Sequence, residues 1–190
     1  MNLADVLDFW FGPPGDLGYG TTRPLWFTKS SATDDLIRTR FGDTVDTALS
    51  STRVEDWTHE PRAALAAIIV LDQFTRNIFR DTPRAFAGDP RALQLAGSLV
   101  DRNDDQKLAP FERWFAYMPF EHSEFLNDQI ESVRLFERLA QQGMPDPLPW
   151  AIKHFDVIKR FGRFPHRNAI LGRESTTAEI EFLKEQGSSF

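Results

Sequence analysis

Apolar residues recur three or four positions apart over most of this chain, and proline or glycine separates one such stretch from the next. This spacing places apolar side chains on one face of an α-helix. Proline lies near the expected helix starts at Pro61, Pro90, Pro110 and Pro147. No stretch alternates between apolar and polar residues for long enough to predict a strand. We therefore expect an all-α fold of about eight or nine helices packed in antiparallel pairs.

The positions of proline and glycine also predict where individual helices begin and end. We expect helices over residues 3–10, 34–48, 61–80, 89–103, 111–118, 125–142 and 148–161, with a last one after residue 175. Pro119 is expected to end the helix 111–118, because proline interrupts helical hydrogen bonding. Ser175 is expected to cap the last helix, with Glu179 nearby.

Composition narrows the class of protein. The absence of cysteine excludes disulfides, thiolate nucleophiles and cysteine-based metal sites. The longest apolar run, which starts at Ala63, is far shorter than a membrane-spanning helix requires. The formal net charge of −6 disfavours binding to nucleic acid over the whole surface. We expect a cytoplasmic protein without a membrane segment.

The most informative segment is LDQFTRNIFR, residues 71–80, which follows the apolar block of residues 63–71. On an α-helix its polar side chains share an arc of roughly 140° with Leu65 and Ile69. A helix that is apolar all round is normally enclosed by protein. We therefore place these polar side chains at a pocket and predict that they bind a ligand: Asp72, Gln73, Arg76, Asn77 and Arg80.

Histidines mark two further segments. If a helix begins at or before Glu121, His122 in PFEHSE projects onto its buried stripe. Glu121 and Glu124 would then lie in the first turn, where they could serve only to cap the helix. His154 lies at the centre of an apolar helix face, where a histidine is more often a core residue than a ligand-facing one.

Basic residues concentrate where GRFPHRN, residues 162–168, breaks the helix before it. Breaks that carry Gly and Pro are places where functional loops tend to lie, so we add Arg163, Arg167 and Asn168 to the predicted ligand-binding residues. With Arg76 and Arg80 these arginines could form an anion clamp, because guanidinium groups match carboxylates and phosphates. Equally, neighbouring acids could pair with the arginines and only tie helices together. Both interpretations stay open.

Five motifs in order, DVLDFWFG, LDQFTRNIFR, AFAGDPRAL, PFEHSE and GRFPHRN, resemble the bacterial family of unknown function DUF924. The resemblance extends from about Asp5 to Glu185. It implies a tetratricopeptide-like, right-handed array of antiparallel helix pairs, with residues 1–190 as a single DUF924-like helical domain. Thr75 departs from the family pattern, which has proline there, so the local helix geometry is in question. The family label implies no reaction.

Two function classes follow, and a third is disfavoured. The first is a binding module that takes an anionic small molecule or acidic peptide. The alternative is an enzyme in which arginines stabilise an anionic substrate and acid–base chemistry comes from candidates that we leave unassigned: His122, Glu124, His154 and His166. RNA binding through residues 153–173 is disfavoured by the acidic balance. We expect no cofactor and no metal site, since ligand spacings are absent. The aromatic content also allows a homo-oligomer.

Overall fold

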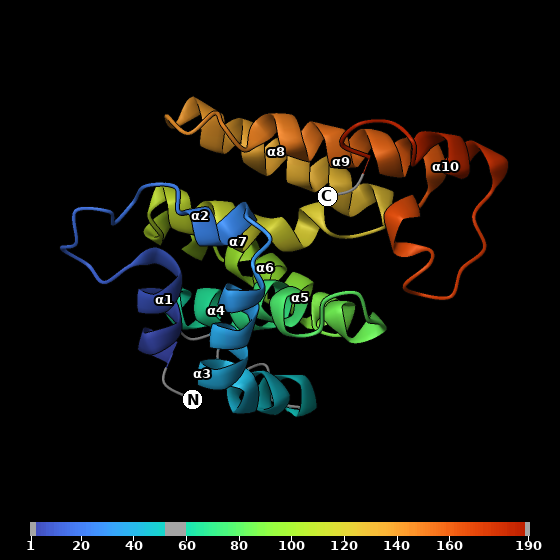
Figure 1. Ribbon diagram of the computed structural model, residues 1–190. Helices are drawn as coiled ribbons and strands as arrows, with labels where there is room; N and C mark the ends of the chain where they lie inside the picture. The colour runs from blue at the N-terminus through green and yellow to red at the C-terminus, as the bar shows by residue number, and fades with distance from the viewer. Residues whose placement is uncertain (1–2, 52–59, 189–190) are drawn as a thin grey trace.

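A computed structural model describes residues 3–51 and 60–188, and within these ranges it has helices and no strands, which confirms the predicted all-α class (Figure 1). The α-helices are α1 (Leu3–Phe11), α2 (Pro24–Phe27), α3 (Ser31–Ser50), α4 (Pro61–Ile68), α5 (Thr75–Ile78), α6 (Asp89–Asp101), α7 (Pro110–Glu121), α8 (Leu126–Gln141), α9 (Leu148–Phe161) and α10 (Thr177–Phe182). A π-helix, η2 (Ile69–Phe74), joins α4 to α5. Short 3-10 turns are η3 (Pro83–Phe86), η4 (Asp104–Lys107) and η5 (Pro165–Arg167). None of the described helices has the length and apolar character needed to cross a membrane.

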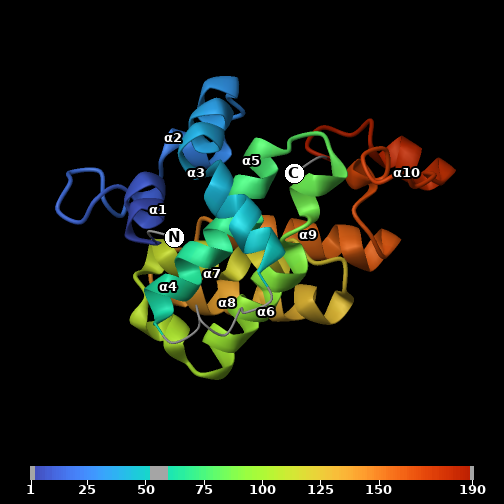
Figure 2. The same cartoon turned by 90° about the horizontal axis from the view of Figure 1, so that it is seen from below.

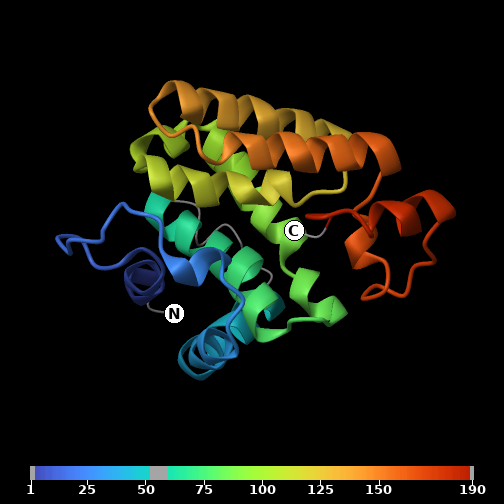
Figure 3. The same ribbon diagram turned by 45° about the horizontal axis from the view of Figure 1, so that its top comes forward.

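The helices form successive layers. Helices α8 and α9 lie side by side on one side of the molecule and α3 lies on the other, with α7 and then α4, α5 and α6 between them (Figure 1). Helix α1 stands beside α4 (Figure 1). Seen from below, α3, α4 and α5 cross in front of α7, α8 and α9 (Figure 2). Helix α10 stands beyond the end of α9 (Figure 3). The right-handed repeat array implied by the family resemblance stays a prediction.

Aromatic side chains tie the first helix to the centre of the core. The Trp10 ring lies 5.6 Å from the Phe74 ring and 5.6 Å from the Phe115 ring, edge to face in both cases. All three side chains are buried, and each such ring pair adds about 0.5–1.5 kcal/mol beyond its buried area. Trp10 of α1 thus packs against both η2 and α7, so the core itself places the polar residues of η2.

The continuous α-helix predicted over residues 61–80 is wrong in its middle, because residues 69–74 form a π-helix. In a π-helix the hydrogen bonds run from i to i+5, so the following side chains are rotated away from their α-helical directions. The Leu71 carbonyl accepts a hydrogen bond from Thr75 Oγ1 at 2.7 Å. Gly88 packs directly on this carbonyl, where no larger residue has room. The departure at Thr75 thus falls at the end of the π-helix.

Three predicted helix boundaries also need correction. Helix α3 starts earlier than predicted, because the Ser30 side chain caps it by accepting a hydrogen bond from Thr33 N at 3.3 Å. Helix α7 continues past Pro119, since a proline near the last turn removes one backbone donor without ending the helix. Thr176, and not Ser175, caps α10 in a capping box.

Gly88→Ala is expected to lower the free energy of unfolding by about 1–3 kcal/mol, because the wild-type backbone leaves no space for the added methyl group. Its Cβ would lie 2.1 Å from the Leu71 carbonyl oxygen. Gly97→Ala in α6 is the matched control: nothing lies within 4 Å of its added Cβ, so this change should be neutral or stabilising. Urea unfolding measures both, and equal stability of the two variants would contradict the close contact.

Candidate functional site

A buried carboxylate, Asp72, lies at the centre of the polar segment of η2. Its Oδ1 is 2.7 Å from His122 Nδ1 and 3.3 Å from Arg76 Nη1. Gln73 Nε2 donates to Asp72 Oδ2 at 2.5 Å. Burial alone would raise the pKa of Asp72, but Arg76, His122 and Gln73 outweigh burial and hold this pKa below its usual value. Asp72 therefore carries its negative charge inside the protein.

His122 follows the last residue of α7 and is oriented by Asp72. Burial lowers the pKa of His122, even though Asp72 pulls in the opposite direction. In the neutral ring, Nδ1 donates its proton to the Asp72 carboxylate and Nε2 keeps the basic lone pair. This geometry is one that enzymes use to prepare an imidazole for proton transfer.

Two arginines meet at Asp89, the first residue of α6. Arg76 donates two hydrogen bonds to the Asp89 carboxylate, at 2.8 and 3.0 Å. Arg167 Nη1 lies 3.7 Å from Asp89 Oδ2. Both guanidinium groups lie over the Phe86 ring, at 5.6 Å for Arg76 and 4.8 Å for Arg167. Arg167 also lies 4.5 Å from the Phe164 ring, so aromatic faces surround it.

Arg167 has unused hydrogen-bonding capacity. Its side chain is 8% exposed, and among the described residues its buried Nε has no hydrogen-bond partner. Burial and the neighbouring Arg76 lower the pKa of Arg167 to about 10, which still leaves it cationic at neutral pH. A buried donor without an acceptor is costly, and more so on a charged group. Arg167 is therefore the group best suited to accept a further anionic partner.

Glu121 and His154 form a second buried pair. Glu121 Oε1 lies 3.0 Å from His154 Nδ1, which also lies 2.8 Å from the Trp150 carbonyl oxygen. Since a carbonyl only accepts, Nδ1 carries the proton. Burial and the nearby Asp72 raise the pKa of Glu121 to about 8, and burial lowers the pKa of His154 to about 3. The His122 and His154 rings are 6.3 Å apart, so the two pairs are neighbours.

Glu124 and His166 lie at the edge of this region. Glu124 accepts hydrogen bonds from Arg173 at 2.7 and 2.9 Å and from the backbone N–H of Phe164 at 2.8 Å. Burial would raise the pKa of Glu124, but these bonds outweigh burial and lower it. The His166 ring lies 5.6 Å from the Phe164 ring, and burial together with Arg167 lowers the pKa of His166 to about 4.

We call the polar side chains that meet here the central polar cluster: Asp72, Arg76, Asp89, Glu121, His122, His154, His166 and Arg167. They come from η2, α5, α6, α7, α9 and η5, so segments far apart in the sequence build one site. Over residues 3–51 and 60–188, no group of three or more His, Asp or Glu side chains is arranged to hold a metal ion.

Two of the residues predicted to line the site point elsewhere. Asn77 Nδ2 donates to Asp34 Oδ1 at 2.7 Å, and Arg80 donates to both oxygens of Asp34 at 2.8 Å. Asp34 belongs to α3, which packs against η2 and α5 on the side opposite to α7 (Figure 1). The π-helix divides the predicted polar arc into two groups, one directed to His122 and the other to α3.

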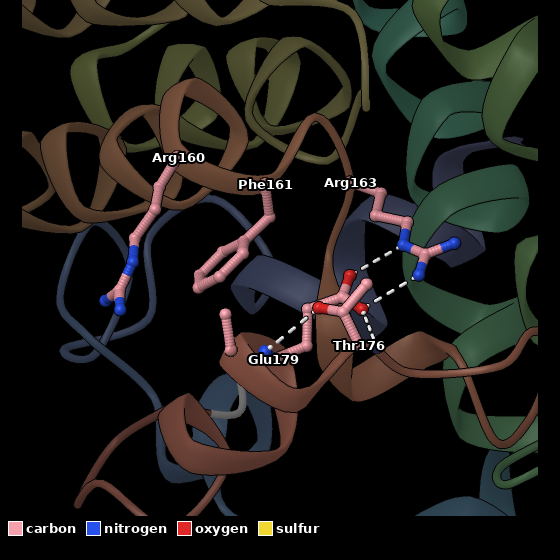
Figure 4. A pocket seen from close by; sticks show the side chains of 6 residues that line it. Arg160, Phe161, Arg163, Thr176 and Glu179 are labelled. Carbon is pink, nitrogen blue, oxygen red and sulfur yellow. Dashed lines mark hydrogen bonds and ion pairs between the residues drawn. The ribbon is translucent and has the colours of Figure 1, made fainter.

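The C-terminal residues predicted to bind a ligand are also divided. Arg163 donates to both oxygens of Glu179 at 2.6 and 2.8 Å, beside an open surface depression of about 630 Å³ (Figure 4). Asn168 is buried between Ser175 and Arg173, with hydrogen bonds of 3.0 Å to each. The structure therefore brings Arg76 and Arg167 together and places Arg80 and Arg163 in separate ion pairs.

Sequence reasoning missed two members of the cluster. Asp89 was expected only to start a helix, although it stands next to Gly88 in the motif AFAGDPRAL. Glu121 was expected in the first turn of a helix, but it is the last residue of α7, and α8 begins five residues later. Its carboxyl group is therefore buried inside the cluster and caps nothing. Only its position beside His122 in PFEHSE could have drawn attention to it.

Comparison with known proteins agrees with this architecture. The family model described as "Bacterial protein of unknown function (DUF924)" matches residues 6–187, so the chain belongs to the DUF924 family. The chain is similar to a solved structure, the protein of unknown function ATU0120 from Agrobacterium tumefaciens. The two are 36% identical, with a TM-score of 0.83 over 96% of each chain. No curated protein matches this chain.

Glu121→Gln replaces a carboxyl group whose pKa is raised from 4.5 to about 8 on folding. Below pH 4.5 Glu121 is protonated in both the folded and the unfolded protein. Between pH 4.5 and about 8 it ionises only in the unfolded protein, so the free energy of unfolding of the wild type falls by up to about 1.4 kcal/mol per pH unit. The variant lacks this loss, so its stability relative to the wild type should rise between about pH 5 and about pH 8.

Urea unfolding of Glu121→Gln and wild type across this range measures the effect. Glu124→Gln is the control with the opposite sign, because the pKa of Glu124 is lowered and its contribution is lost as the pH falls. A stability difference between Glu121→Gln and wild type that does not change with pH would show that Glu121 ionises normally.

Proposed function

We propose that the protein binds a small anionic ligand, or the acidic group of a peptide, at the central polar cluster, with Arg167 as the main contact. The observation that carries this proposal is the buried Arg167 guanidinium, whose Nε has no partner among the described residues. Its nearest carboxylate oxygen, on Asp89, is 3.7 Å away. An anion that reaches Nε would satisfy both the donor and the charge.

The other arginines in this part of the protein differ from Arg167, because each already has a hydrogen-bonded carboxylate partner. Arg76, Arg80, Arg163 and Arg173 each hold one carboxylate with two hydrogen bonds, on Asp89, Asp34, Glu179 and Glu124 respectively. The geometry of these four pairs is that of structural ion pairs that link one segment of the chain to another. Arg167 makes no such bond to any residue that the structure describes, although it is the most buried of the five arginines. A purely structural role would leave this costly charge poorly satisfied.

An acid–base enzyme is the second candidate function, and the Asp72–His122 pair favours it. The 2.7 Å contact orients the imidazole and leaves Nε2 as its basic nitrogen. Arg167 would then hold the anionic group of a substrate while His122 moves a proton. Binding is the first function to test, because it is common to both candidates.

The proposal predicts that an anionic ligand raises the melting temperature of the wild type and has little effect on Arg167→Gln. At a hundred times its dissociation constant, a ligand adds about 2.7 kcal/mol. This corresponds to roughly 5–10 °C for a chain of this length. A thermal-shift panel of carboxylates, phosphorylated metabolites, nucleotides and acidic peptides provides the measurement.

Arg160→Gln is the matched control, because it removes the same charge from an exposed position on α9. Its thermal shift should equal that of the wild type. A shift that survives in Arg167→Gln, or is lost equally in both variants, would refute Arg167 as the main contact.

A further inference from the structure

We propose that the ligand's anionic group is a monocarboxylate that binds between Arg76 and Arg167, and that Asp89 occupies this position in the free protein. This inference rests on the proposed function and adds the class of ligand and the residue that competes with it. Asp89 would act as an internal substitute for the ligand's carboxylate.

The geometry around Asp89 is that of a bound carboxylate. Arg76 holds its two oxygens at 2.8 and 3.0 Å, in the paired arrangement with which arginine recognises free carboxylates. Arg167 approaches from a second direction, and the Phe86 ring lies beneath both guanidinium groups. The contact at 3.7 Å shows that Asp89 satisfies Arg76 well and Arg167 poorly. A ligand not attached to α6 can approach Arg167 more closely.

Asp89 also has a route out of this position. Its side chain is 20% exposed, whereas the side chain of Asp72, the other carboxylate beside Arg76 Nη1, is 1% exposed. Rotation of the Asp89 side chain therefore moves its charge towards water. At the first position of α6 the carboxylate still benefits from the positive end of the helix dipole. Leaving Arg76 thus costs Asp89 less than it would cost a fully buried acid.

Charge balance selects a monocarboxylate. The ionised groups around Asp89 are Arg76 on α5, Arg167 on η5 and Asp72 on η2. Glu124 also acts on Arg167, but its charge is balanced by its ion pair with Arg173. The neutral titratable groups nearby are Glu121 at the end of α7, His122 directly after it, His154 on α9 and His166 within η5. With Asp89 turned outward, two cations face one anion. One negative charge restores neutrality, and a dianionic phosphate would leave an unpaired charge beside buried Asp72.

The pair formed by Asp34 and Arg80 provides an internal comparison. Asp34 is also held by two arginine hydrogen bonds, and Asn77 supplies a third donor. Arg38 also lies close enough to act on the charge of Asp34, but its guanidinium group is held by Asp35 and by the Ile78 carbonyl. Removing the Asp34 carboxylate leaves one partly exposed arginine, whereas removing the Asp89 carboxylate leaves two.

The experiment uses Asp89→Ala with formate and acetate as probes, against chloride and phosphate at equal ionic strength. We expect formate and acetate to raise the melting temperature of Asp89→Ala well above their effect on wild type, with binding at least about tenfold tighter by calorimetry. Chloride and phosphate should do less. Asp34→Ala, the matched control, should gain no more from formate than from chloride.

The outcomes separate this inference from the proposed function. If wild type binds a carboxylate through Arg167 but Asp89→Ala binds formate no more tightly, Asp89 is not a competitor and the proposed function stands. If neither protein binds any anion of the panel, both proposals are wrong. Equal rescue of Asp34→Ala, or stronger rescue by phosphate, would overturn the monocarboxylate assignment.

A second variant covers the case in which Asp89→Ala does not fold. In Asp89→Asn an uncharged amide keeps the shape of the side chain and leaves Arg76 and Arg167 without their anion. Formate should therefore stabilise Asp89→Asn more than it stabilises wild type. Equal stabilisation of the two would refute the exchange of Asp89 for a ligand.

Discussion

The arrangement of the helices around the central polar cluster depends on the need to stabilise one buried negative charge, that of Asp72. Asp72 is almost fully enclosed, so its carboxylate depends on Arg76, His122 and Gln73 for every favourable contact. The π-helix turns Asp72 and Arg76 towards these partners, and Gly88 allows the following loop to pack on the Leu71 carbonyl at that point. Arg76 in turn needs Asp89, which brings the start of α6 and then Arg167 to the same place.

The two buried acids of the cluster hold opposite protonation states for physical reasons. A cation and two hydrogen-bond donors stabilise the ionised form of Asp72, whereas burial and the charge of Asp72 both disfavour the ionised form of Glu121. Their pKa values are therefore driven in opposite directions, a pattern typical of sites that bind charged ligands or transfer protons.

The sequence predicted the helical class well because helix periodicity and proline positions are local signals, as at Pro61, Pro110 and Pro147. It also selected Asp72, Arg76 and His122, which do meet in the cluster. It failed where a residue's direction depends on a distant partner: Arg80 turns to α3, and Glu121 ends a helix that Pro119 was expected to end. An α-helical wheel cannot represent the π-helix, so it merged two groups of side chains that the structure separates.

By itself, then, the sequence determined that the chain is helical, that apolar segments enclose a polar stretch at residues 71–80, and that histidines and arginines accompany it. Those properties follow from spacing along the chain. Only the tertiary structure decided which charges meet, that Asp89 satisfies Arg76, and that Arg167 keeps an unused donor. Ion pairing depends on distances of a few ångströms between segments far apart in sequence, and the packing of the core sets those distances.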